Sequence, residues 1–180
     1  MTNTEPLMSP GDRDSLTGSV TGVLQKLLDL MGIEGSIVPR AEPVVGVDEG
    51  TAPVVLDIEG DDLGILIGRR GQTLSCLQYI VRLIVGHQLN IWVPVIIDVE
   101  GYKQRRYEAL QALALHMAEQ VKARGTPFTL EPMSPFERRI IHLALAENPN
   151  VTTQSVGEGE ARKVVIIPKN DTISKSFKNR

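Results

Sequence analysis

The sequence predicts an α+β protein made of two small domains in tandem. Segments with apolar residues spaced by three and four alternate with short β-branched runs, the pattern of mixed helices and strands. The charge also divides the chain, since residues 1–100 carry 6 Lys and Arg against 14 Asp and Glu and the remainder 13 against 8. A length of 180 residues leaves room for two small cores. We expect a disordered tail over 1–18, domains over 19–100 and 101–170, and a tail over 171–180.

The first domain is predicted to begin with a helix and a hairpin. Apolar residues line one helical face from Ser19 to Met31, and Gly32 is a suitable stop. A strand interrupted by two prolines follows over 35–47. The turn Asp48-Glu49-Gly50 then leads into the strand Val54–Glu59, whose apolar and acidic residues alternate.

Two helices and a third strand complete this domain. Asp61 or Asp62 could cap a short helix. A helix is expected over Gln72–Val85, and a strand over Ile91–Ile97. Pro94 places that strand at a sheet edge or a bulge, because proline cannot donate to a ladder.

A Gly-x-x-Gly turn, Gly68-Arg69-Arg70-Gly71, opens onto the predicted helix that begins at Gln72. Glycines allow a tight turn and close backbone approach to a ligand. The unpaired N–H groups of a helix N-terminus attract anions, and arginine adds a planar fork that fits phosphate. We predict a clamp for a phosphodiester backbone, the alternative being a purely structural turn. The Gly-Lys-Ser/Thr of an ATP-binding loop is missing.

The second domain is predicted to contain a long helix, a second helix and a strand. The long helix covers Tyr102–Arg124, and Gly125 ends it. Ser134, followed by proline and by Glu137, forms an N-cap with a capping box. The strand covers 164–167.

Arg138 and His142 lie about 40° apart on the predicted helix that starts after Ser134. A guanidinium and an imidazole side by side could hold a phosphate, with histidine as a further donor. By itself such a pair would be surface decoration. The residues expected to face the core are Phe136, Ile140, Leu143 and Ala144.

Two resemblances connect these features. The element order around the glycine turn resembles a type II KH fold, in which such a loop grips about four nucleotides. The segment Glu137–His142 with 155–160, Arg162 and the strand 164–167 resembles the arginine–three–histidine domain of the bacterial Jag (SpoIIIJ-associated) family. The predicted fold is therefore a type II KH-like domain followed by a small α+β domain with a three-stranded sheet and two helices.

The resemblance covers about residues 20–169 and assigns the binding residues. It makes Arg138 and His142 the signature pair and Arg69 and Arg70 the variable residues of the KH loop; we add Gly68, Gly71, Gln72 and Arg162 as nucleic-acid-binding residues. It implies a bacterial cytoplasmic protein of post-transcriptional control linked to the cell envelope or elongation, beside another small KH protein. Many Jag proteins carry an additional N-terminal domain, whereas a short tail precedes the KH segment here, so roles of that domain are not carried over.

Other chemistry has little support. Cys76 is the single cysteine, which excludes an internal disulfide and a cysteine-rich zinc site and fits a reducing compartment. The three histidines lack ligand spacing, and no nucleophile–base pair is found, so we expect no metal, cofactor or enzymatic activity. The first residues do not form a signal peptide, and no apolar run reaches the roughly 20 residues that cross a bilayer.

The predicted function is binding of single-stranded RNA, with single-stranded DNA left open. Aromatic residues make up 4% of the chain, so bases would lie on an aliphatic groove more than on stacking platforms. The main alternative is a protein-interaction adaptor whose KH domain pairs with a partner and for which RNA is incidental. A nucleotide-hydrolysing enzyme is a distant third.

Overall fold

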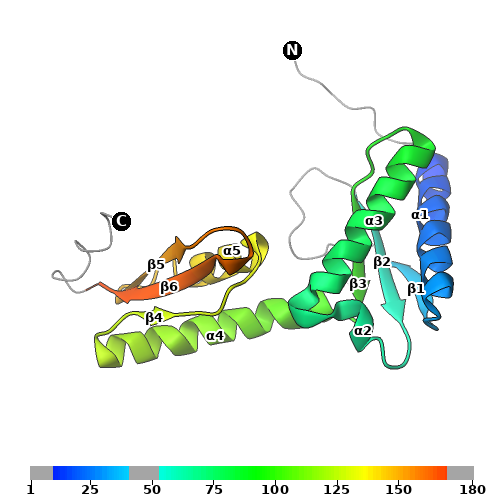
Figure 1. Cartoon of the computed structure of the whole chain (residues 1–180). Helices are drawn as coiled ribbons and strands as arrows, with labels where there is room; N and C mark the ends of the chain where they lie inside the picture. The colour runs from blue at the N-terminus through cyan, green and yellow to red at the C-terminus, as the bar shows by residue number, and fades with distance from the viewer. Residues whose placement is uncertain (1–9, 41–52, 170–180) are drawn as a thin grey trace, which may run out of the picture. The chain divides into compact units, whose positions relative to one another are not determined.

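The computed structural model describes residues 10–40 and 53–169. The chain divides into two compact units, Met1–Lys103 and Gln104–Arg180, close to the boundary predicted after residue 100. Each unit combines helices with a three-stranded sheet, as Figure 1 shows, which confirms the α+β class. In the described ranges, no helix has both the length and the apolar character needed to cross a membrane.

The first unit has the element order predicted from the sequence. Its sheet has the order β1-β2-β3, with β1 antiparallel and β3 parallel to the central β2. This arrangement confirms the predicted helix, two strands, two helices and strand. The elements are α1 (Pro10–Met31), β1 (Ser36–Arg40), β2 (Val54–Glu59), α2 (Gly64–Ile67), a 3-10 turn (Arg69–Gly71), α3 (Gln72–Leu89) and β3 (Val95–Val99).

The core of this unit forms where α1 and α3 pack against one face of the sheet. Buried residues recur every three or four positions along each helix, and every second position along β2 and β3 points to the same core. These positions are Leu16, Val20, Leu24 and Leu28 of α1, Leu74, Leu77, Val81 and Val85 of α3, and Val54, Leu56, Ile58, Val95, Ile97 and Val99 of the strands.

The first helix starts earlier than predicted. We expected residues up to Gly18 to form a disordered tail, but α1 begins at Pro10. Proline is well suited to a first helical turn, where its missing N–H is not needed. Leu16 also continues the buried stripe of α1 by one turn, which holds residues 10–18 in the helix. The rest of the predicted tail lies outside the described residues, as do the tail after residue 170 and the Asp48-Glu49-Gly50 turn.

Three predicted boundaries in the first unit were also wrong. The N-cap position of α2 is Leu63, without a side-chain hydrogen bond, so neither Asp61 nor Asp62 caps this helix. Helix α3 continues past Val85 to Leu89, because the next residue that takes the left-handed conformation is Asn90. Strand β3 starts only after Pro94, although it does lie at the sheet edge.

Both edges of this sheet carry features that oppose further strand pairing. On β3, the N–H of Ile97 donates to Oε1 of Gln78 (3.1 Å), and the guanidinium of Arg82 donates to the carbonyl of Val95 (3.5 Å). On β1, Pro39 lacks a backbone donor. The edges are therefore poor sites for adding a strand from another chain.

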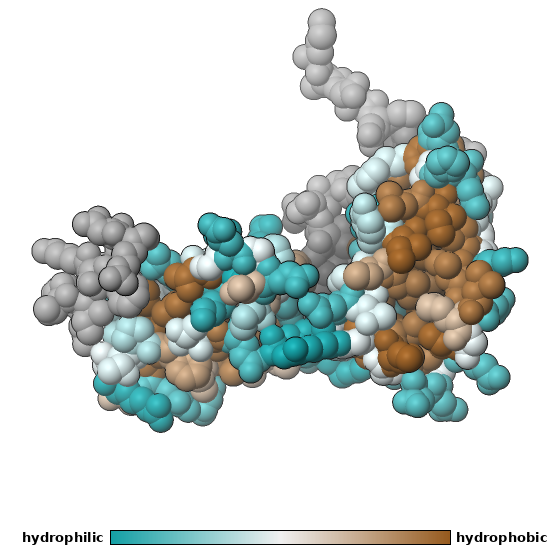
Figure 2. Space-filling model, viewed as in Figure 1, coloured by the Kyte–Doolittle hydropathy of each residue, from teal (hydrophilic) through white to brown (hydrophobic). Residues whose placement is uncertain are grey.

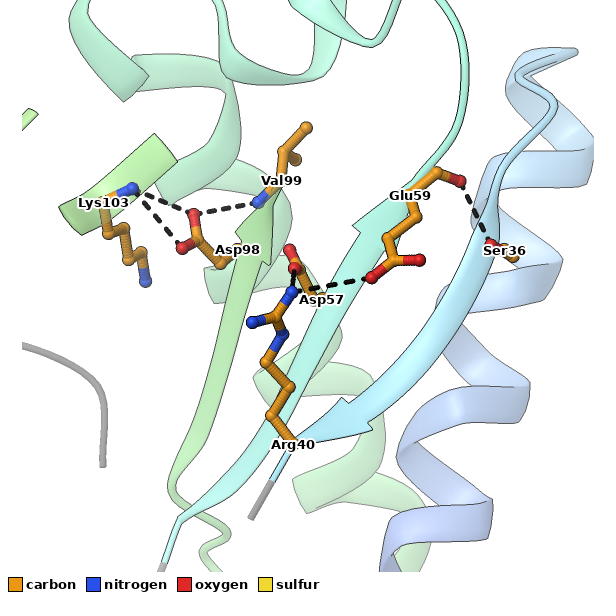
Figure 3. Close-up of polar contacts among 7 residues, drawn as sticks. All are labelled: Ser36, Arg40, Asp57, Glu59, Asp98, Val99 and Lys103. Atoms are coloured by element: carbon orange, nitrogen blue, oxygen red, sulfur yellow. Dashed lines mark hydrogen bonds and ion pairs between the residues drawn. The ribbon is translucent and has the colours of Figure 1, made fainter. Parts of the chain in front are cut away.

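The other face of the sheet carries a group of charged side chains (Figure 3). Asp57 on β2 is almost fully buried and pairs with Arg40, which also lies 3.5 Å from Glu59. Asp98 lies in register with Asp57 on β3. It accepts from the backbone N–H of Lys103 (3.1 Å), and thus holds the start of the following helix beside the strand. Buried carboxylates without such partners would be strongly destabilising.

The second unit contains two helices and a sheet of order β4-β6-β5 in which each pair is antiparallel. This confirms the predicted small α+β domain. Its long helix has the predicted bounds, with the N–H of Gly125 donating to the carbonyl of Val121 at its end. The elements are α4 (Tyr102–Arg124, its first two residues in the first unit), β4 (Phe128–Thr129), α5 (Pro135–Ala144), β5 (Val151–Val156), a 3-10 turn (Gly159–Ala161) and β6 (Lys163–Pro168).

The buried face of helix α5 is shifted from the one predicted, although Ile140 and Ala144 pack in the core as expected. Phe136 and Leu143 are exposed, whereas Glu137 and Ile141 are buried with Ile140. Phe136 and Leu143 are apolar side chains that nevertheless lie on the exposed side of the helix. The observed stripe is centred one position later, and it leaves Arg138 and His142 at its edge.

Candidate nucleic-acid interface

The glycine turn of the first unit has a backbone that only glycine adopts easily. Gly68 lies at φ 66°, ψ −170°, a region almost restricted to glycine. Gly71 lies at φ 76°, ψ 13°, in the left-handed region, and Arg70 between them also has positive φ. This backbone turns the chain sharply from α2 into α3.

The surroundings of the turn leave no room for a side chain at either glycine. A Cβ on Gly68 would lie 2.0 Å from Oγ1 of Thr73, and one on Gly71 would lie 2.9 Å from Cε1 of Tyr102. Thr73 therefore packs against Gly68, and Tyr102 packs against Gly71. Neither residue was predicted as part of the site, because a close contact with a glycine depends on residues that the fold brings together.

The loop leads directly into the N-terminus of α3. No side chain caps this helix. The N–H of Gln72 donates to the carbonyl of Arg69, and the remaining N–H groups of the first turn lie at the positive end of the helix dipole, which favours an anion. Arg69 and Gln72 are exposed beside that end. Arg70 is half-buried and interacts with other residues of the protein. The two arginines, which the sequence treats alike, therefore differ in exposure.

The second candidate site lies on α5 and β5. The guanidinium of Arg138 donates through Nη1 to Oγ of Ser155 (3.3 Å). The ring of His142 lies between two hydroxyls, with Nδ1 2.6 Å from Oγ1 of Thr153 and Nε2 2.9 Å from Oγ of Ser155. The structure thus brings the predicted pair together through Ser155, which contacts both residues.

The environment of His142 favours the neutral ring. Partial burial lowers the pKa of His142 from its ordinary value, and the positive charge of Arg138 lowers it further. Both ring nitrogens are already hydrogen-bonded, so the ring has no spare donor for a phosphate in this arrangement. Among the described residues, the buried Nε of Arg138 has no hydrogen-bond partner.

Glu137 fixes the start of α5 just before Arg138. Its carboxylate accepts from the backbone N–H of Ser134 (3.0 Å), and the hydroxyl of Ser134 accepts from the N–H of Glu137 (3.3 Å), which confirms the predicted capping box. The same carboxylate accepts from Nε of Arg106 on α4 (2.8 Å). Because Glu137 is buried, this ion pair ties α5 to α4 and sets the position of the following arginine.

Arg162 is less closely tied to the pair. Its side chain is exposed, and its carbonyl accepts from the N–H of Met133, near the start of α5. The hydrogen bonds found within this site in the described part of the chain join Arg138 and His142 to β5. Arg162 therefore remains a predicted outer contact.

Thr153 and Ser155 were missed as site residues. Their signal is the two-residue period of β5, which puts both hydroxyls on the strand face that carries buried Val151. Nothing in the sequence alone shows that this face meets the Arg138 side of α5. In the described ranges, no cluster of three His, Cys, Asp or Glu residues could hold a metal ion.

The fold and the two sites define a class of protein in which a KH domain is followed by an arginine–three–histidine domain. Comparison with protein families agrees: residues 36–97 match the KhpA/KhpB KH domain, and residues 108–168 match the arginine–three–histidine domain. These ranges lie within the two units described above.

Curated relatives extend the likeness over most of the chain. The RNA-binding protein KhpB of Clostridium symbiosum is 39% identical over 154 residues, which span 86% of this chain and 67% of the relative. For KhpB of Bacillus subtilis the identity is 35% over 153 residues, 84% of this chain and 73% of the relative. For KhpB of Lactiplantibacillus plantarum it is 38% over 120 residues, 67% and 37% of the two chains. The chain belongs to the KhpB (Jag) family, as its motifs predicted.

Proposed function

We propose that this protein binds single-stranded RNA through the Gly68–Gly71 loop and the Arg138–His142 pair. The observation that carries the proposal is the strained glycine turn, which opens onto the uncapped N-terminus of α3 beside the exposed Arg69. Such a turn gives a phosphate both backbone donors and positive charge. The names of the relatives, RNA-binding protein KhpB, support RNA as the ligand.

The presence of two sites on one chain raises the affinity for a strand that occupies both. When one site holds a strand, the other meets the same strand at a high effective concentration. A strand long enough to occupy both sites therefore binds more tightly than either site alone allows. The net charge of −3 keeps non-specific attraction to nucleic acid small, so binding depends on these local cations.

Fluorescence anisotropy with a labelled single-stranded RNA at two salt concentrations tests this proposal. The variants are Arg69→Asp/Arg70→Asp and Arg138→Ala/His142→Ala, and we expect each to weaken binding by about 1–3 kcal/mol, the range for charge-assisted contacts. Arg13→Asp and Arg139→Ala, at exposed positions on α1 and α5, are the controls. Equal affinity of all variants would contradict the proposal. A DNA strand of the same sequence decides between RNA and DNA.

The salt dependence provides a separate check. Each phosphate contact that is lost should reduce the slope of log affinity against log salt by about 0.7 for a single strand. The loop variant and the pair variant should each show a smaller slope than the native protein.

We further propose that RNA binding serves post-transcriptional control in the bacterial cytoplasm, in connection with the cell envelope or cell elongation. Family membership supports this part of the proposal. A strain without the gene should show altered cell length, and the native gene should restore it where the Arg138→Ala/His142→Ala variant does not. If the native gene and the variant gene both restored the cell length, the cellular role would not depend on RNA binding by this pair.

A second candidate function, pairing with another small KH protein, is favoured by the exposed face of α3. Tyr79, Ile80 and Leu83 are exposed there, and Figure 2 shows hydrophobic side chains gathered over this part of the first unit. If this surface serves a protein partner, Leu83→Glu should abolish association with a small KH protein of the same cell and leave RNA affinity unchanged. An intact association would exclude this face as the contact.

A further inference from the structure

Ser155 has an unusual set of neighbours. Its hydroxyl oxygen lies 3.3 Å from Nη1 of Arg138 and 2.9 Å from Nε2 of His142. A guanidinium can only donate, so the oxygen of Ser155 accepts from Arg138. The role of the single hydroxyl proton then depends on the tautomer of His142. If Nε2 carries no proton, the hydroxyl donates to Nε2. If Nε2 is protonated, Nε2–H donates to the oxygen of Ser155, and the hydroxyl proton is not used by His142.

The two contacts of His142 differ in length, which favours one of these arrangements. An N–H donor and an oxygen acceptor usually lie about 2.7–3.2 Å apart, so a shorter contact fits a hydroxyl donor better. The contact between Nδ1 and Thr153 is 2.6 Å, and that between Nε2 and Ser155 is 2.9 Å. We assign Thr153 as the donor to Nδ1 and Nε2–H as the donor to Ser155. The lowered pKa of His142 agrees with a neutral ring that has one proton to place.

With this assignment both acceptor positions of the Ser155 oxygen are filled. Its proton is then not used by Arg138 or His142. We propose that the Ser155 hydroxyl donates to a phosphate oxygen of the bound strand. His142, held by Thr153, is the positioning residue, because its Nε2–H occupies an acceptor position of Ser155 and leaves the hydroxyl proton for the phosphate. This inference rests on the proposed function of the Arg138–His142 pair and assigns a different role to each member.

The chemistry of the neighbourhood fits a phosphate. Ser155 is half-buried, so its hydroxyl reaches the surface of the β5 strand. The adjacent Arg138 supplies positive charge, and the acidic Glu137 is already occupied by Arg106 and by the capping box. An anion placed at Ser155 would receive a hydroxyl hydrogen bond and the attraction of a guanidinium.

The binding test uses the full chain and a labelled ten-nucleotide oligouridine RNA. Ser155→Ala should weaken binding by about tenfold, as expected for a hydrogen bond to a charged group. Ser155→Cys, which keeps the shape of the side chain but donates poorly, should fall between Ser155→Ala and the native protein. Thr152→Val, on the exposed face of the same strand, is the control and should bind like the native protein. Unchanged affinity of the folded Ser155→Ala protein would overturn the inference.

The positioning role has its own readout. Long-range ¹H–¹⁵N NMR of the imidazole should show the proton on Nε2 of His142 in the native protein. Thr153→Val keeps the volume but removes the donor, and should shift the ring toward the Nδ1–H form and weaken RNA binding by a few-fold. An Nδ1–H ring in the native protein would overturn the assignment.

Arg138→Ala separates failure of this inference from failure of the proposed function. If Arg138→Ala and Ser155→Ala both bind like the native protein, the second site does not take part in binding at all. If Arg138→Ala weakens binding and Ser155→Ala does not, the proposed function stands and the role of Ser155 is wrong.

Discussion

The Gly68–Gly71 loop and the Arg138–His142 pair both present arginine, before a helix in the loop and on a helix in the pair, but their geometry is held in different ways. In the loop the backbone determines the geometry, and Thr73 and Tyr102 fill the space behind the glycines. In the pair the helix is regular, and side chains from β5 hold the functional groups. The first site should therefore be sensitive to any Cβ, and the second to the loss of single polar groups.

The largest expected effect concerns the anchor of the second site. Glu137→Ala removes the capping box and leaves the cation of Arg106 without its partner. We expect the free energy of unfolding of the second unit to fall by about 3 kcal/mol, the lower end for breaking a buried ion pair, because Arg106 is partly exposed. Hydrogen exchange of amides in α5 and β5 measures this change for that unit alone.

Glu119→Ala is the control for this prediction, since Glu119 forms an exposed ion pair with Lys122 (3.6 Å) on α4. Such pairs contribute little, so its exchange should hardly change. Equal effects of the two variants would contradict the anchoring role of Glu137.

The next effect concerns the backbone of the first site. Gly68→Ala puts a Cβ against Thr73 at a backbone conformation that alanine avoids. We expect a loss of about 2 kcal/mol of stability in the first unit, with RNA binding by the loop abolished. Thermal unfolding and anisotropy measure the two effects.

Gly64→Ala is the matched control, since Gly64 starts α2 and has open space at its Cβ position. Alanine is favourable in a helix, so this variant should be at least as stable as the native protein. If Gly68→Ala behaves in the same way, the loop does not need its observed conformation.

A smaller effect compares the same substitution at both sites. Lysine keeps the charge of arginine but loses the planar fork. Arg138→Lys should lower RNA affinity by about tenfold, because the bond to Ser155 depends on that fork. Arg69→Lys should change affinity by less than about threefold, because the backbone of the loop supplies the directional donors. Equal losses in anisotropy titrations would remove the proposed distinction between the sites.

The smallest effect is a pH dependence of the second unit. The folded-state pKa of His142 lies below its ordinary value of 6.5, so the unfolded chain binds the proton more readily. The stability of the unit should therefore be complete above pH 6.5 and should decrease as the pH falls through the window below it. His142→Gln lacks this component, and hydrogen exchange of α5 at several pH values should show a flatter profile for that variant. A native profile as flat as that of His142→Gln would contradict a depressed pKa.

Most of the element order could be predicted because it rests on local patterns. The bounds of α4 followed from its apolar spacing and Gly125, and the start of α5 from Ser134 and Glu137. The errors lay where tertiary contacts outweigh local preference. Leu16 extends α1 through packing, and the buried face of α5 is chosen by what lies beneath it.

The sequence by itself determined the fold class, the family and the two arginine-containing motifs, since these depend on spacing along the chain. Only the tertiary structure decided how each motif is supported. Tyr102 packs against Gly71, and Ser155 joins Arg138 to His142, although Tyr102 and Ser155 are each remote in sequence from the residues they contact. The physical reason is that a hydrogen bond or a close packing contact depends on distances of a few ångströms, which local propensity does not specify.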